Sequence, residues 1–145
     1  KLDKAEREIR SQSYYTPFHA AVAKAISDRS DPILVTVHSF TPVYHGAART
    51  VEIGVLHDRD ARLADAMLDA ADRAGAQNVR RNDPYGPEDG VTHTLRKHAL
   101  PGGHLNVMLE VRNDLIADAA AQDDMAKRLG DWLESALSTT GAAAC

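Results

Sequence analysis

Two apolar runs carry the residue types most capable of chemistry. Residues 33–37 are apolar or β-branched and lead directly into His38, and residues 105–111 carry Glu110 and are followed by Arg112. An imidazole is a common zinc ligand, a carboxylate can act as a general base, and a guanidinium can bind a carboxylate through two hydrogen bonds. We expect both runs to be buried strands whose carboxyl ends form two halves of one site.

Glu110 has two interpretations. Strand alternation places Met108, Glu110 and Arg112 on one face, so Glu110 and Arg112 could form an ion pair with a purely structural role. In the functional interpretation, burial raises the pKa of Glu110, which then acts as a general base on a metal-bound water. Arg112 or Arg49 would then bind a substrate carboxylate.

One histidine does not make a zinc site, because a catalytic zinc keeps three protein ligands. His93 and His98 are five residues apart, which does not place both on one helical face. None of the other histidines completes a recognised ligand pattern: His19, His45, His57 and His104. The residues therefore hold at most part of a metal centre, and His38 could instead simply hydrogen-bond a neighbour.

Nucleophilic catalysis has weaker support. Ser39 follows His38 directly, so the two side chains of a strand would point to opposite faces, and no Gly-x-Ser-x-Gly elbow surrounds the serine. Cys145, the only cysteine, is the final residue. Gly102 and Gly103 lack the lysine and the helix start of a phosphate-binding loop.

Composition narrows the function classes. The chain has 145 residues, 43% hydrophobic residues and a formal net charge of −4, which argues against a nucleic-acid-binding surface. No apolar run approaches the roughly 18 residues of a membrane-spanning helix, and no signal-peptide pattern opens the chain. We expect a cytoplasmic protein with a small-molecule partner and no nucleic-acid or membrane partner. The oligomeric state does not follow from the residues.

Periodicity predicts alternating helices and strands, and therefore an α/β fold with a mixed, largely parallel sheet and helices on both of its faces. Thr16 and Pro17 indicate a helix start, with Phe18, Ala21, Val22, Ala25 and Ile26 facing a core. We expect strands at 33–38, 51–56, 78–81 and 105–111. We expect a helix that begins at Asp58 or Asp60 and ends at about residue 74, with Gly75 as its C-cap. Two further helices are expected at 91–99 and 122–137, and residues 82–90 should form a loop.

The predicted organisation is a polar lead-in at 1–13, an α/β domain at 14–137 and a mobile tail at 138–145. Because the sequence opens on Lys1 and is helix-like at once, we expect it to be part of a longer protein.

Four ordered segments resemble the N-formylglutamate amidohydrolase family. They are His38-Ser39-Phe40-Thr41-Pro42 with Gly46 and Arg49; Ile53-Gly54-Val55-Leu56; Asn82-Asp83-Pro84-Tyr85; and Leu109-Glu110-Val111-Arg112-Asn113-Asp114-Leu115-Ile116. The resemblance extends from about Tyr14 to Leu137. It implies a three-layer, phosphorylase/hydrolase-like and zinc-carboxypeptidase-like fold. It also implies hydrolysis of a linear amide bond in an N-acyl amino acid. In the reaction after which the family is named, N-formylglutamate and water give formate and glutamate, a late step of histidine breakdown.

Carried over by motif, the resemblance makes His38 a zinc ligand and Glu110 the general base. It places Arg49, Asn82, Tyr85 and Arg112 in the substrate pocket. One zinc ion is expected in the complete protein. The family's first metal ligands come from an upstream segment, which implies that these residues form an incomplete catalytic fragment. Zinc, nickel and cobalt are not distinguished by one imidazole.

Two other functions stay open. The chain could be a metal-free domain that binds an acidic small molecule through its arginines, or a related zinc deacylase or peptidase. The 89–95 stretch, which contains His93, indicates a branch whose substrate need not be formylglutamate.

Overall fold

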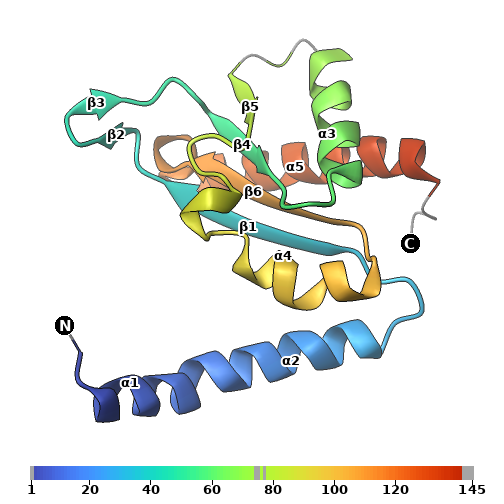
Figure 1. The fold of residues 1–145 in the computed structure, drawn as a ribbon. Helices are drawn as coiled ribbons and strands as arrows, with labels where there is room; N and C mark the ends of the chain where they lie inside the picture. The colour runs from blue at the N-terminus through green and yellow to red at the C-terminus, as the bar shows by residue number, and fades with distance from the viewer. Residues whose placement is uncertain (1, 74–75, 77, 142–145) are drawn as a thin grey trace. The chain divides into compact units, whose positions relative to one another are not determined.

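The computed structural model describes residues 2–73, 76 and 78–141. The chain divides into two compact units, Lys1–Pro32 and Ile33–Cys145 (Figure 1). Across the described residues, every helix is too short or too polar to span a bilayer.

The first unit is one continuous helical segment. It consists of α1 (Lys4–Arg10), a π-helical turn η1 (Ser11–Tyr15) and α2 (Thr16–Ser27), and the Asp3 carboxylate caps its start by accepting the Glu6 N–H at 2.8 Å. The helix α2 begins at Thr16, as the sequence predicts, but the chain is already helical before this position, because Tyr15 has φ −63° and ψ −52°. Pro17 lacks an N–H to donate, and the wider π turn just before it lets the helix continue past this position.

Only part of the predicted inner face of α2 is buried. Val22 and Ile26 are half-buried, whereas Ala21 and Ala25 are exposed and Phe18 keeps 54% of its surface in solvent.

The second unit is built on a four-stranded sheet with the order β1-β6-β4-β5. Its strands are β1 (Leu34–Phe40), β4 (Ile53–Leu56), β5 (Val79–Arg81) and β6 (Asn106–Arg112). β1 runs parallel to β6 and β4 runs parallel to β5, whereas β4 and β6 are antiparallel. The predicted mixed, largely parallel sheet and α/β class are confirmed.

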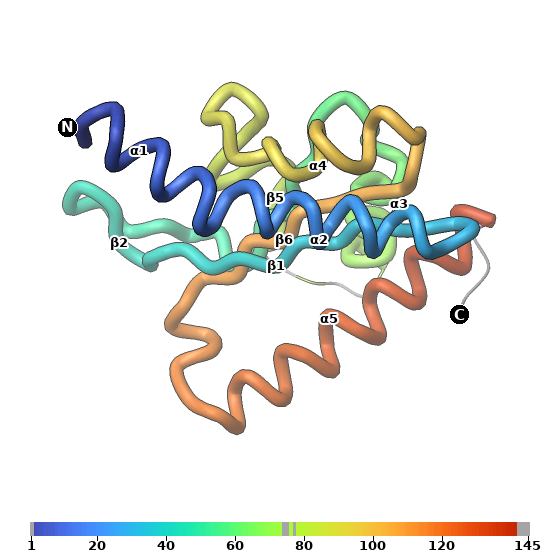
Figure 2. Tube along the Cα trace, turned by 90° about the horizontal axis from the view of Figure 1, so that it is seen from below, coloured from blue at the N-terminus to red at the C-terminus, as the bar shows by residue number. Residues whose placement is uncertain are grey.

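Helices cover both faces of this sheet. On one face, α3 (Arg62–Arg73) and α5 (Ala119–Thr140) pack on alternate strand residues such as Ile53, Leu109 and Val111. On the other face, α4 (His93–His98) contributes Leu95 to a smaller cluster with Leu56 and Met108. Figure 2 shows α4 and α5 on opposite sides of the central strands. Because strand residues alternate between faces, Glu110 lies on the α4 side of the sheet.

The helix α5 confirms its predicted inner stripe. Met125 is buried in the larger core cluster, and four partly buried residues pack against that cluster: Leu129, Trp132, Leu133 and Leu137. The Trp132 indole also donates to the Met67 carbonyl at 2.7 Å, which ties α5 to α3. The helix extends to Thr140, so the predicted mobile tail is wrong at 138–140, while 142–145 and the predicted C-cap Gly75 lie outside the described residues.

The prediction of a fully buried first strand is wrong. Val37 is 61% exposed, and residues 38 and 39 are also exposed. The reason is that β1 lies at the sheet edge and pairs only with β6 among the described strands.

The remaining connections are short and regular. A hairpin of β2 (Val43–Tyr44) and β3 (Ala47–Ala48) turns at His45 and Gly46, both with positive φ. Three 3₁₀ turns follow further along the chain: η2 (Pro87–Asp89), η3 (Leu100–Gly102) and η4 (Asn113–Ile116).

Candidate active site

Glu110 lies at the centre of the candidate site. It occupies β6, with His38 of β1 as its register partner on one side and Gly54 of β4 on the other. Neighbouring strands are about 4.8 Å apart, and paired residues share a face, so the imidazole and the carboxylate are brought together. Glu110 is 5% exposed, and its Oε2 is buried without a hydrogen-bond partner among the described residues.

The electrostatic environment of Glu110 combines burial with nearby cations. Burial raises the pKa of the Glu110 carboxyl above its ordinary value, while His38 and Arg49 act in the opposite direction. A carboxyl group with a raised pKa binds a proton more readily, which is the property a general base uses at neutral pH. No Glu110–Arg112 ion pair forms among the described residues, because Arg112 pairs with Asp114 instead.

Arg49 is held in a box of aromatic rings. Its guanidinium carbon lies 4.5 Å from the ring centre of Tyr44, 5.1 Å from that of Tyr85 and 5.4 Å from that of Phe40. The Nη1 group donates to the Thr41 carbonyl at 3.2 Å and to the Tyr85 hydroxyl at 3.3 Å. These contacts fix the guanidinium in place and leave donors on Nε and Nη2 without a described hydrogen bond, so the group can bind an anion.

Tyr85 reaches Arg49 from a loop that folds back over β4. The Asn82 N–H donates to the Val55 carbonyl at 3.1 Å, and the Asn82 side-chain oxygen accepts the His57 N–H at 2.9 Å. Asn82 therefore anchors the start of the loop, with a left-handed φ of 46°. Its amide nitrogen has no described bond and is the part of Asn82 that could still reach a ligand.

Arg112 is largely committed to the scaffold. Its Nη1 donates to the carbonyls of Arg49 at 3.1 Å and Val51 at 3.4 Å, and its Nε donates to Asp114 at 2.8 Å. These bonds connect the end of β6 to the segment that carries Arg49. They favour a positioning role for Arg112 over direct contact with a substrate.

The described residues do not by themselves match a catalytic zinc site. His38 and Glu110 are adjacent, but no group of three potential ligands from His, Cys, Asp and Glu gathers anywhere in the described part of the chain. A catalytic zinc needs three protein ligands, so His38 is at most one of them.

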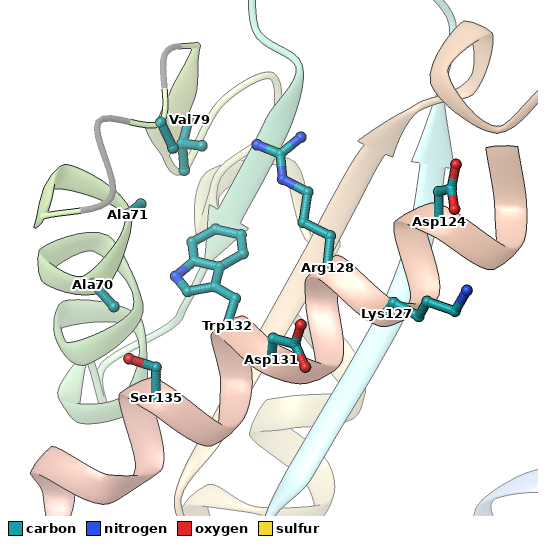
Figure 3. Close-up of a pocket in the computed structure, with 10 residues that line it drawn as sticks. Ala70, Ala71, Val79, Asp124, Lys127, Arg128, Asp131, Trp132 and Ser135 are labelled. Atoms are coloured by element: carbon teal, nitrogen blue, oxygen red, sulfur yellow. The ribbon is translucent and has the colours of Figure 1, made fainter.

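A hollow of about 540 Å³ lies elsewhere, between α3, β5 and α5 (Figure 3). Ala70, Ala71, Val79 and Trp132 line it, and several of these side chains belong to the larger core cluster. The hollow therefore lies on the sheet face that does not carry Glu110, and none of the predicted site residues line it.

Sequence reasoning missed three residues around the site. Phe40 and Tyr44 enclose Arg49, and nothing in their spacing indicates this, because they meet only through the hairpin. Gly54 had a signal: a glycine inside a short apolar strand often marks the close approach of another backbone segment.

Comparison with protein families gives a clear result. The family model described as N-formylglutamate amidohydrolase matches residues 1–117. This chain belongs to the N-formylglutamate amidohydrolase family. The membership agrees with the four motif segments and extends over most of the chain.

Two solved structures are similar to this family member over nearly its whole length. A crystal structure of a gene product from Agrobacterium tumefaciens is 58% identical with a TM-score of 0.92, covering 96% of this chain and 56% of that one. The crystal structure of N-formylglutamate amidohydrolase from Ralstonia eutropha JMP134 is 21% identical with a TM-score of 0.60, covering 97% and 55%, and supports the fold alone. The chain thus spans about half the length of each. Among curated proteins, none matches.

Proposed function

We propose that this member of the family is an amidohydrolase, with Glu110 as the general base, acting on an N-acyl amino acid such as N-formyl-L-glutamate. The proposal rests on the buried Glu110 carboxylate between His38 and Gly54, whose Oε2 has no hydrogen-bond partner in the described part of the chain. Burying a polar atom without a hydrogen-bond partner costs free energy, and a reacting water bound at Oε2 would supply the partner.

The chain's residues divide the work of hydrolysis. Glu110 accepts a proton from the attacking water as the new C–O bond forms at the acyl carbonyl, and then passes it to the amine as the C–N bond breaks. Arg49 binds the substrate carboxylate, with Tyr85 holding the guanidinium in place. The Asn82 amide nitrogen, which has no hydrogen bond among the described residues, would contact the substrate, and Arg112 positions Arg49 through the Arg49 carbonyl.

His38 enters the proposal as a single zinc ligand, on the strength of the family resemblance. The described residues gather no full ligand set around it. We also propose that the protein acts in the cytoplasm, at a late step of histidine breakdown.

The decisive experiment replaces Glu110 by glutamine in the native polypeptide that contains these residues. Hydrolysis of N-formyl-L-glutamate should fall by about 10²- to 10⁴-fold in kcat, the usual contribution of a general base. Glu134→Gln, on the exposed side of α5, is the matched control and should retain full activity. Zinc content is measured in parallel.

Two results would contradict the proposal. Retention of kcat within about threefold in Glu110→Gln would remove Glu110 from the chemistry. Loss of bound metal together with activity would assign it to metal binding instead of proton transfer.

A binding domain for an acidic small molecule is the second candidate, favoured by the ring box that holds Arg49. A panel of N-acyl amino acids separates the functions. Binding of carboxylates without turnover supports the binding domain, and turnover of another N-acyl amino acid in preference to formylglutamate supports a related deacylase.

A further inference from the structure

Gly54 leaves room on β4 for another segment of backbone. A Cβ built at this position would overlap the Asp83 carbonyl oxygen and lie 2.8 Å from Leu56 Cδ1 and 3.3 Å from the Asp83 carbonyl carbon. The Asp83 carbonyl is backbone and cannot rotate away as a flexible side chain could. A side chain at residue 54 would therefore lift the 82–85 loop by about 1 Å to restore ordinary contact distances.

The loop is held on both sides of this close approach. Before it, Asn82 is bonded to Val55 and His57 of the β4 segment. After it, Tyr85 packs against the Leu56 cluster and bonds the guanidinium of Arg49. Moving the loop away from Gly54 must strain or break one of these attachments.

The loop rests directly beside the proposed base. Gly54 is the register partner of Glu110, so the point where the loop touches the sheet is one strand away from the carboxylate. We propose that Gly54 is a positioning residue that seats the 82–85 loop on the sheet and thereby sets how far the Tyr85–Arg49 pair lies from Glu110. This inference rests on the proposed function, because that separation then decides which N-acyl amino acids fit.

The first test is Gly54→Ala in the native polypeptide. Misplacement of a binding group by about 1 Å can cost about 10²-fold. We expect kcat/KM for N-formyl-L-glutamate to fall by about 10- to 100-fold, mainly through KM, because Glu110 itself does not move. Gly130→Ala, at an exposed position of α5 where an added Cβ would meet nothing within 4 Å, is the control and should leave KM unchanged.

A second measurement does not depend on turnover. Amide hydrogen exchange at Asn82 and His57 should accelerate at least about tenfold in Gly54→Ala, while exchange at Leu109 in the middle of β6 stays unchanged. Unchanged protection at Asn82 and His57 would overturn the proposal even if activity fell. If the parent hydrolyses no N-acyl amino acid, the proposed function fails, and the exchange comparison still decides whether Gly54 seats the loop.

If Gly54→Ala does not fold, Tyr85→Phe provides a second test of the same proposal. It removes only the hydroxyl that accepts from Arg49, and leaves the sheet and the loop backbone intact. The variant should remain folded and raise KM in the same direction as Gly54→Ala. An unchanged KM would overturn the claim that the seated loop acts through Tyr85 and Arg49.

Discussion

Glu110 is a buried carboxyl group, so its protonation couples to the stability of the fold. Its pKa is raised in the native state, chiefly by burial. Between the unfolded pKa and this higher native value, the native state binds more protons than the unfolded state. The free energy of unfolding therefore falls as pH rises through that window, and the stabilisation present at low pH is lost above it.

This sign gives a prediction that is independent of activity. Glu110→Gln cannot ionise, so it should become more stable than the parent as pH rises from about 4 to 8, with little difference at the acid end. Urea unfolding of both proteins at several pH values measures this. A parent that gains stability over Glu110→Gln with rising pH would mean that His38 and Arg49 outweigh burial.

Arg112 acts at the scale of elements, because it joins the end of β6 to the segment that leads into β4. Hydrogen bonds to charged groups contribute about 1.5–3 kcal/mol each when their partners are buried, and part of that is recovered by water at a half-buried site. Arg112→Ala should therefore lower the free energy of unfolding by about 2 kcal/mol. Arg128→Ala, at an exposed position of α5 on the rim of the hollow, should change it by less than about 0.5 kcal/mol.

Urea unfolding checks this pair, and Arg112→Lys adds a further comparison. A lysine cannot place nitrogens at both Asp114 and the two carbonyls, so it should not restore stability. Equal effects of Arg112→Ala and Arg128→Ala would show that Arg112 does not hold these elements together.

At the scale of the whole molecule, the number of ligands that the described residues bring together limits metal binding. His38 is adjacent to Glu110, but the described residues gather no third ligand around them. We therefore expect this 145-residue chain, equilibrated with equimolar zinc and then dialysed, to retain well under one zinc per chain by elemental analysis. About one zinc per chain, lost on His38→Ala, would contradict this expectation and locate a complete site within these residues.

The length of the chain also bears on how activity is measured, since it spans about half the length of each of the two solved relatives. Activity is therefore best measured in the native polypeptide that contains these residues. Measurements of stability and hydrogen exchange address contacts within the second unit alone.

The sequence alone was sufficient for most of the elements. Strand composition and helical periodicity predicted β1, β4, β5, β6 and α5, because apolar residues repeat with the period of the structure that buries them. The predicted start at Thr16 matches α2, but a local capping signal does not reveal that the preceding turn is also helical. The four motif segments also led to the correct family.

Tertiary structure alone decided how the candidate residues meet. Register places His38, Glu110 and Gly54 in one row across three strands, and a pairing shifted by one residue would have turned the side chains to opposite faces. The positions of Arg49 and Tyr85 depend on a folded-back loop that touches the sheet at Gly54. Periodicity records which face a residue occupies, but contacts between distant segments depend on the three-dimensional path of the chain, and that path fixed the geometry around Glu110.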